Sequence, residues 1–464
     1  MGSGQFGGLL PSDDDDASSD DDDTSSDDDD SSSDDDDSSS DDDDTSPFDS
    51  GIEDLLSSTF RIDISRIDVG LDYTPGANTL LGEATVRFTM RPGQTVPIIH
   101  FTPIADVDLD SLASITLNGE ALDPQDEDDV RQRVLPGSSQ RVLEFQRAVD
   151  PTSEHVLDMT WESQSWWEDV APGWLFTDVS DIAGEGNEIF FPTINSPEEL
   201  SRHVIELRIH SGSPYRVLGS GLVTEDGAQT GPEPVQLYTV DTEREVSSIT
   251  VLLVAAPRDE VLYEERTVAG VPIRIASITE QAEVEQAFDD AESVLNMLQD
   301  DFGPLPMERG LSVLLTTDYG GGMEYFGGTI SDGWALQHEI VHMYFGTSTV
   351  ARTWRDSWWD EAINVWYLWP GGYDSLWSGY ESDIVSGQTP VQPSFDTRAY
   401  NEGAAIFELV ADRVGGREAL IDALAAIRAD HTFAPFTTGD LIIYLEEFTG
   451  VDLSEEFARW VYGQ

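Results

Sequence analysis

The sequence predicts a multidomain α+β protein in which an all-β, sandwich-like domain precedes an α-rich domain. Between about residues 60 and 256, short segments alternate apolar and polar residues and are separated by turn signals such as Pro75-Gly76 and Asn118-Gly119, a pattern typical of β-strands. From about residue 257 the apolar period lengthens to about 3.6 residues, which is typical of amphipathic helices. We therefore expect an acidic leader over residues 1–50, the β-domain over 51–256 and the helical domain over 257–464.

The expected elements follow from this periodicity and from start and stop signals. Strands are predicted over residues 60–69, 82–90, 204–210, 249–255 and 311–316. Helices are predicted over residues 280–302, 332–345, 357–369, 398–414, 418–429, 440–448 and 453–462. Thr279 and Asp356 are the expected caps of two of these helices, because their side chains can accept hydrogen bonds from free backbone N–H groups.

The leader is dominated by five runs of four aspartates, which begin at Asp13, Asp20, Asp27, Asp34 and Asp41. Residues 12–46 otherwise hold only Ser, Thr and Ala, so they can bury almost nothing, and their charges repel one another. We expect this segment to be disordered and extended. It could serve as a tether that holds a folded domain off a cell surface, or as a solubilising tail.

The charge of the whole chain is extreme. It has 92 acidic and 23 basic residues, a net charge of −69, and every basic residue is Arg. The first 50 residues contain 21 Asp, so the other 414 residues still carry −48. Molar salt relieves such self-repulsion by shortening the screening length to ~3 Å, and we interpret the protein as one adapted to salt-rich surroundings. A nucleic-acid partner is disfavoured, because phosphate binding needs a basic surface.

Other classes are excluded by what the chain lacks. It has no Cys, so disulfides and thiolate metal ligands are excluded. No apolar run approaches the ~18 residues of a membrane span. Residues 1–11 are Gly-rich and do not have the basic and apolar regions of a signal peptide. The leader favours an exported, surface-attached protein, and the alternative is a cytoplasmic protein of a salt-accumulating cell.

The chemistry is expected between residues 338 and 361. His338 and His342 are four residues apart on a predicted helix, so they lie on one face and can bind one metal ion together. Glu339 is next to this pair and can reach a water molecule on the metal. Glu361 is placed on the following helix as a third ligand. Two histidines, one carboxylate and an open fourth position are the pattern of a catalytic zinc site.

Two other groups of residues are interpreted as structural. Trp161, Trp166, Trp167 and Trp174 could line a ligand cleft, but such aromatic residues more often pack in a core or an interface. The histidines at positions 100, 155, 203 and 210 are scattered and have no ligand spacing. We therefore assign no chemistry to either group.

The motifs resemble the gluzincin zinc aminopeptidases of the membrane alanyl aminopeptidase family. That family carries His-Glu-x-x-His, an eighteen-residue gap and Asn-Glu-Gly, where this chain has Asp360-Glu361-Ala362. Its Gly-Ala-Met-Glu-Asn motif corresponds to Gly-Gly-Met-Glu-Tyr at residues 321–325, and its Tyr-x-Lys-Gly to Tyr-Asn-Glu-Gly at 400–403. Residues 189–198 resemble its Phe-Pro-x-x-Asp-x-Pro stretch, so the similarity extends from about residue 60 to the end.

The resemblance implies a thermolysin-like catalytic domain with one zinc ion. His338, His342 and Glu361 would bind the zinc, and Glu339 would be the general base. The substrates would be peptides.

The resemblance also assigns roles to residues outside the metal helices. Tyr400 would donate a hydrogen bond to the oxyanion that forms during hydrolysis, and Glu324 would bind the free amino terminus of the peptide. Backbone groups would be presented to the substrate by Gly321, Gly322 and Met323.

Three features depart from the family pattern. The β-domain usually supplies a second carboxylate that binds the substrate amine, and only Asp181 and Glu185 lie in the right neighbourhood, without a clear motif. By this resemblance we expect a short form without the C-terminal helical domain of larger members. Glu402 stands where the family has Lys, which reverses a charge beside Tyr400.

We therefore expect a zinc-dependent aminopeptidase that removes N-terminal residues from peptides. An open-cleft endopeptidase or a relaxed peptidase is the enzyme alternative, because no capping domain is expected over the cleft. A peptide-binding scaffold on the same fold is the non-enzyme alternative, and an intact metal triad with Glu339 argues against it.

Overall fold

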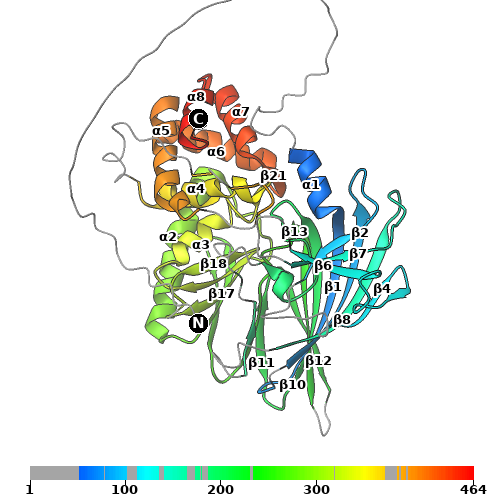
Figure 1. The fold of residues 1–464 in the computed structure, drawn as a ribbon. Helices are drawn as coiled ribbons and strands as arrows, with labels where there is room; N and C mark the ends of the chain where they lie inside the picture. The colour runs from blue at the N-terminus through cyan, green and yellow to red at the C-terminus, as the bar shows by residue number, and fades with distance from the viewer. Residues whose placement is uncertain are drawn as a thin grey trace, which may run out of the picture.

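A β-rich part comes first in the chain, and a part that contains most of the helices follows and lies beside it (Figure 1). The computed structural model describes residues 52–77, 79–101, 112–134, 141–164, 173–177, 179, 186–229, 234–317, 319–370, 384–385, 388–392 and 396–463. The acidic leader expected over residues 1–50 lies outside the described residues. Within the described ranges, no helix has both the length and the apolar character needed to cross a membrane.

The β-rich part is built on an eight-stranded sheet in the order β12-β13-β10-β1-β2-β8-β4-β5. Its strands are β1 (Ile62–Tyr73), β2 (Thr79–Met90), β4 (Leu112–Leu117), β5 (Glu120–Leu122), β8 (His155–Gln164), β10 (Leu200–His210), β12 (Leu222–Gln229) and β13 (Val235–Ser247). Neighbours are antiparallel, except that β1 and β10 are parallel. Side chains such as Ile67, Val86 and Ile205 are buried on one face, and polar residues alternate with them on the other, as expected for a half-buried sheet.

Two three-stranded sheets complete this part. One has the order β3-β7-β6 and the other β11-β14-β9. Their strands are β3 (Ile98–His100), β6 (Val130–Val134), β7 (Arg141–Phe145), β9 (Leu175–Phe176), β11 (Tyr215–Gly219) and β14 (Leu253–Pro257). The 3-10 helix η3 (Asn187–Ile189) precedes β10. Helix α1 (Ile52–Phe60) leads into β1 and buries Ile52, Leu56 and Phe60.

A five-stranded sheet opens the second part, in the order β15-β16-β17-β19-β18. Its strands are β15 (Leu262–Val268), β16 (Val271–Ser277), β17 (Leu311–Thr316), β18 (Gly322–Tyr325) and β19 (Gly328–Asp332). Strand β18 lies at the edge of this sheet and carries Glu324. The hydroxyl of Tyr325 donates to the carbonyl oxygen of Thr177 at 2.9 Å, and this bond ties β18 to the β-rich part.

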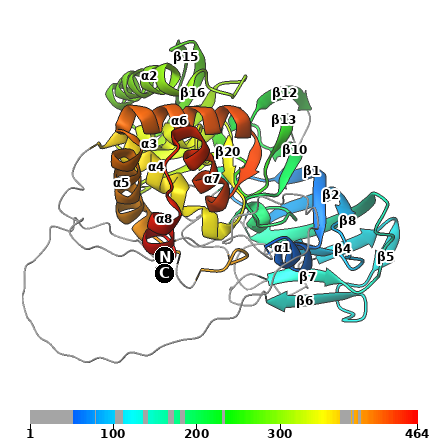
Figure 2. The same cartoon turned by 90° about the horizontal axis from the view of Figure 1, so that it is seen from above.

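The remaining helices gather on the same side of the molecule (Figure 2). They are α2 (Gln281–Phe302), α3 (Leu336–His342), α4 (Trp358–Leu368), α5 (Ala404–Val414), α6 (Arg417–His431), α7 (Thr438–Thr449) and α8 (Ser454–Trp460), with the short turns η4 (Trp354–Asp356) and η6 (Ala399–Gly403). Strands β20 (Thr349–Ala351) and β21 (Ala434–Phe436) pair in parallel. The core between the helices is made of large side chains that include Trp358, Trp366 and Phe407.

The helix that carries the metal motif is shorter than predicted. We expected residues 332–345 to be helical, but α3 covers only Leu336–His342. Asp332 belongs to β19 instead, and its carboxylate accepts hydrogen bonds from the N–H groups of Tyr319 (3.1 Å) and Gly320 (2.8 Å). Asp332 therefore holds the loop before β18 rather than capping α3.

The two predicted caps were also wrong. Glu280 rather than Thr279 precedes α2, and no side chain caps that helix. Ser357 precedes α4, while Asp356 ends the turn η4, which Thr353 caps. The Asp356 carboxylate accepts a hydrogen bond from the N–H of Thr438 at 2.9 Å, across 82 residues of sequence. These partners are distant in the chain, so local pattern could not reveal them.

Candidate metal centre

Helix α3 presents both candidate histidine ligands on one face. The Nε2 atoms of His338 and His342 are 3.0 Å apart. On the opposite side of the helix, Leu336 and Ile340 are buried in the core, so the amphipathic pattern of α3 fixes which way the histidines turn. His342 is fully buried, and 12% of the His338 side chain is exposed.

Helix α4 brings Glu361 to the same point. Its Oε2 atom lies 2.9 Å from Nε2 of His338 and 3.5 Å from Nε2 of His342. Glu361 is at the start of α4, and the neighbouring Trp358, Trp359 and Ala362 are buried. The carboxylate is therefore anchored by packing rather than by solvent-exposed contacts.

The three ligand atoms fit one zinc ion. In a tetrahedral site with bonds of ~2.1 Å, neighbouring ligand atoms are roughly 3.4 Å apart. The observed separations of 2.9, 3.0 and 3.5 Å are close to this value. Nε2 of His338, Nε2 of His342 and the Glu361 carboxylate thus converge in one buried space, as the donor set of a bound zinc ion does.

The protonation of these groups follows from burial and from the surrounding charges. Burial lowers the pKa of His338. Burial acts the same way on His342, but Glu324, Asp360 and Glu361 outweigh it and raise the pKa of His342 well above its ordinary value. Burial would raise the pKa of Glu361, yet the charges of His342 and His338 hold it below the ordinary value. The site therefore keeps a carboxylate ionised and attracts positive charge.

Asp360 lies behind the second histidine. Its Oδ1 atom is 2.8 Å from Nδ1 of His342, and the amide of Asn364 donates to it at 3.4 Å. A carboxylate at this position holds the imidazole ring and leaves Nε2 free for a metal. Asp360 was not among the predicted site residues, although its place directly before Glu361 in the sequence was a usable signal.

Glu324 reaches the same region from β18. Its Oε1 atom is 4.0 Å from Nδ1 of His342, and the residue is 8% exposed. Glu324, Asp360 and Glu361 together line a small hollow of about 40 Å³. The other side chains around this hollow are apolar ones, such as Met323, Val350 and Trp354, and hydroxyl-bearing ones, such as Thr250 and Thr347. The hollow therefore combines three carboxylates with a mixed apolar and hydroxyl lining.

Glu339 is buried against the strand that carries Glu324. A side chain at Gly322 would collide with the Glu339 carboxylate, so only glycine allows β18 to approach α3 this closely. Gly321 uses its carbonyl oxygen to accept a hydrogen bond from the N–H of Asp332 at 2.8 Å. The predicted Gly-Gly-Met-Glu segment thus lies beside the predicted general base.

Tyr400 enters the site on a π-helical turn, η6. Its hydroxyl donates to Oε1 of Glu361 at 2.9 Å, and its ring stacks on His338 with centroids 6.0 Å apart. A side chain at Gly403 would lie 2.7 Å from Cβ of Ala362, so glycine lets η6 pack closely on α4. π-Helical turns of this kind are frequent at functional sites.

The sequence-predicted residues thus come from four places in the chain and meet at one point. His338, His342, Glu361 and Tyr400 lie within one cluster, and Glu324 adjoins it. Glu339 lies on the same helix as the histidines, with its carboxylate against Gly322. The two candidates for a second amine-binding carboxylate, at positions 181 and 185, lie outside the described residues.

In comparisons with known proteins, the chain is similar in sequence to aminopeptidases. No protein-family model matches the chain. It is 20% identical to aminopeptidase N of Streptomyces lividans over 451 residues, which is 86% of this chain and 50% of that protein. It is 22% identical to aminopeptidase M1-B of rice over 245 residues, or 43% of this chain and 28% of that protein. The chain is homologous to M1 aminopeptidases, and it spans half or less of the length of these relatives.

Solved structures share the fold. An M1 zinc metallopeptidase of Deinococcus radiodurans, solved with a Tyr-Ser-Ala peptide, matches 87% of this chain and 94% of its own with a TM-score of 0.65 and 18% identity. Legionella pneumophila aminopeptidase A, solved with aspartic acid, matches 87% of this chain and 50% of its own with a TM-score of 0.68 and 14% identity. The architecture therefore resembles that of M1 peptidases, with a β-rich part followed by a helical part.

Proposed function

We propose that the chain is a zinc-dependent metallopeptidase that removes N-terminal residues from peptides. The observation that carries this proposal is the convergence of His338, His342 and Glu361 on one point, with Glu339 and Tyr400 beside it. The homology to aminopeptidases supports the same reading. A zinc ion held by the three ligands would act as a Lewis acid toward a water molecule and a peptide carbonyl.

The other residues would handle protons and charge. Glu339 would take a proton from the attacking water and deliver it to the leaving amine, a role that a buried carboxylate beside the metal suits. Tyr400 would donate a hydrogen bond to the oxyanion. Its present acceptor is Glu361, which already places its hydroxyl beside the ligands. Asp360 would keep His342 oriented without touching the substrate.

Selectivity for a free amino terminus would rest on Glu324. A substrate ammonium group would enter the hollow that Glu324 shares with Asp360 and Glu361. Strand β18 is the edge strand of its sheet, so an extended peptide could lie along its outward backbone groups. The apolar part of the lining, which includes Met323, Val350 and Trp354, would exclude some water and strengthen the attraction between the ammonium group and the carboxylates.

The test compares free and blocked substrates in molar salt. Purified protein should hydrolyse aminoacyl-anilides and should leave N-acetylated peptides intact. Bound zinc should be near one per chain, and Glu339→Gln should keep the zinc but lose about 10²- to 10⁴-fold in kcat. Cleavage of N-acetylated peptides alone would instead identify an open-cleft endopeptidase. Protein that binds no zinc and cleaves neither substrate would leave only the peptide-binding scaffold.

A further inference from the structure

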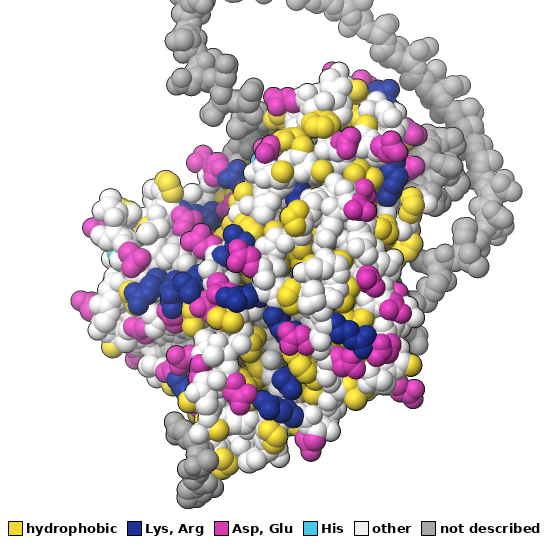
Figure 3. All heavy atoms as spheres, turned by 180° about the vertical axis from the view of Figure 1, so that it is seen from behind, with side chains coloured by type: hydrophobic (Ala, Val, Ile, Leu, Met, Phe, Trp, Pro, Cys, Tyr) yellow, Lys and Arg dark blue, Asp and Glu magenta, His cyan; other side chains and the backbone are white. Residues whose placement is uncertain are grey.

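Arginine is gathered on one face of this acidic molecule (Figure 3). Three adjoining hollows share lining residues: Arg244 belongs to the first and second, and Arg309 to the second and third. We call their eight arginines the arginine band: Arg66, Arg87, Arg202, Arg244, Arg309, Arg216, Arg258 and Arg274. The chain has four acidic residues for each basic one, whereas these hollows are lined by eight arginines and six glutamates. Asp68 and Asp241, which pair with Arg66 and Arg202, bring the number of acids to eight. The band is therefore a nearly neutral area on a strongly acidic molecule.

Part of the band is a row across neighbouring strands. Arg66 on β1 is in register with Arg87 on β2 and with Arg202 on β10. The next strand, β13, contributes Arg244. Like charges that face each other across strands destabilise a sheet unless an opposite charge lies between them. The row is thus a position where negative charge is favourable.

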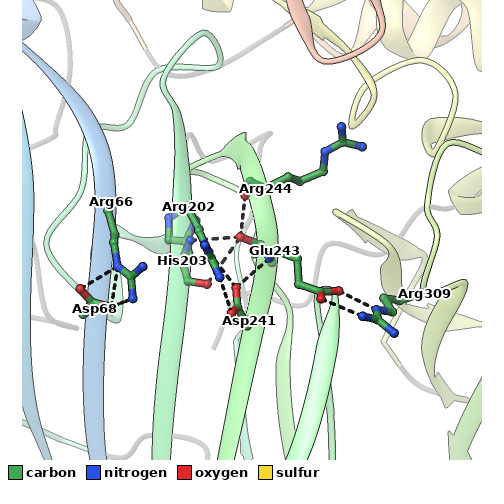
Figure 4. Close-up of polar contacts among 9 residues, drawn as sticks. Arg66, Asp68, Arg202, His203, Asp241, Glu243, Arg244 and Arg309 are labelled. Carbon is green, nitrogen blue, oxygen red and sulfur yellow. Dashed lines mark hydrogen bonds and ion pairs between the residues drawn. The ribbon is translucent and has the colours of Figure 1, made fainter.

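The arginines of the row are only partly neutralised. Arg66 forms a two-pronged pair with Asp68, and Arg202 forms one with Asp241 (Figure 4). Both pairs use Nε and Nη2, so within the described ranges no carboxylate pairs with Nη1 of either arginine. Among the described residues, no carboxylate pairs with Arg87 or Arg244.

The guanidinium group of Arg244 is positioned by a neighbouring aromatic ring. Its guanidinium stacks on Phe433, 3.6 Å from the ring centroid, and this leaves its N–H edge free to donate. The first hollow, which holds the row, has a volume of about 660 Å³. An open hollow with several guanidinium groups suits an extended ligand with many carboxylates.

We propose that the aspartate runs of residues 12–46 bind the arginine band, as a docked state of the leader at low to moderate salt. The leader supplies the required chemistry, with five runs of four aspartates. Four extended residues span roughly 13 Å, and the three strand spacings from β2 to β13 span roughly 14 Å. One aspartate run therefore matches the length of the row.

The leader can also reach the band. The described chain begins at Ile52, and α1 with the start of β1 places Ile52 no more than about 35 Å from Arg66. The fourteen residues 38–51 can extend to about 50 Å, so the run at residues 34–37 reaches the row easily. Tethering raises the effective concentration of the runs to the millimolar range, which favours the leader over a free acidic peptide.

The experiment uses the absence of cysteine in this chain. The full chain with Ser33→Cys in the leader and Thr89→Cys on β2 is labelled at the two cysteines with a fluorescent donor and acceptor of short transfer range. The reference is the same labelled chain with the 20 aspartates of the five runs changed to Asn. At ~0.1 M salt the energy transfer should be about twofold higher with the aspartates than in this reference, and at ~2 M, where screening is complete, the two chains should give the same transfer. Intrinsic tryptophan fluorescence reports whether the fold is kept.

A second arm works at constant salt. A free peptide with the sequence of residues 27–44 should displace the leader and lower the transfer, and its Asn version should not. Arg87→Gln with Arg244→Gln should weaken docking by about tenfold, since two exposed pairs contribute roughly this much together. The matched control is Arg131→Gln with Arg459→Gln, two exposed arginines outside the band.

Three results would overturn the proposal. One is equal transfer in the aspartate and Asn leaders at every salt concentration. Another is an equal effect of the band and control variants. The third is displacement by a single-stranded oligonucleotide but not by the acidic peptide, which would assign the band to nucleic acid instead.

Discussion

Two clusters of carboxylates, each with buried members, differ in where their positive charge comes from. In the β-rich part, Arg91 pairs with Asp63 at 2.8 Å, Glu198 at 2.5 Å and Glu199 at 3.3 Å. In the metal centre, the ion pairs that Glu361 and Asp360 make with described residues come only from histidines.

The two clusters offset the free-energy cost of burying charged carboxylates in different ways. Arg91 carries a permanent positive charge that offsets the acids around it. Glu199 is the most deeply buried acid of the three, and burial raises its pKa to about 8, which lowers the cost of burying it. Among the described residues, no arginine pairs with the acids of the metal centre, and the Nε2 atoms of its two histidines lie 3.0 Å apart. A buried carboxylate without a permanent counter-charge is costly, so a cation from solution would stabilise this cluster.

Metal removal should give the largest effect. Dialysis against a chelator should abolish peptidase activity and lower the melting temperature, because the buried Glu361 carboxylate then loses the cation that offsets its charge. Added zinc should restore both within the time of mixing. An unchanged melting temperature after loss of zinc would mean that the buried carboxylates need no cation. The proposed difference between the two clusters would then be wrong.

Arg91→Met should be the most destabilising substitution in the β-rich part. It removes the shared partner of three acids, and breaking a buried ion pair costs about 3–5 kcal/mol. Urea unfolding in molar salt measures the loss. Arg131→Gln, at an exposed position, is the control and should leave the free energy of unfolding within about 0.5 kcal/mol of the unchanged protein.

Asp360→Asn should weaken zinc binding by about 10- to 100-fold, because it removes the charged partner of His342 while keeping its shape. Competition with a chromophoric chelator measures the affinity. Asp356→Asn is a useful comparison: this acid is fully buried, and it contacts Thr353 and Thr438 instead of a ligand. Equal zinc affinities of the Asp360 and Asp356 variants would show that Asp360 does not contribute to zinc binding.

The smallest effect concerns pH. The pKa of Glu199 is raised from 4.5 to about 8 by burial, so the folded state binds its proton more tightly than the unfolded state. The resulting stability is fully present below pH 4.5 and is lost as pH rises through about 8. Between pH 5 and 6.5 the loss should be at most about 2 kcal/mol. Glu199→Gln should flatten this slope, and an unchanged slope would show that Glu199 is ionised throughout.

Local sequence was sufficient for the parts of the fold that obey short periods. The alternation in β1 and β2 and the helical period of α2 predicted their location to within a few residues. The spacing of His338 and His342 already implied a shared helix face. The ends of elements were less predictable, because partners such as Thr438 for Asp356 are remote in the chain.

The sequence alone was sufficient to identify the residues that could bind a metal and to show that the chain is strongly acidic. Only the tertiary structure decided that Asp360 holds His342, that a π-helical turn delivers Tyr400, and that Arg66, Arg87 and Arg202 form one row. The physical reason is that a spacing of four residues is set by one helix, whereas these contacts join segments whose relative position depends on strand register and on packing across the whole core.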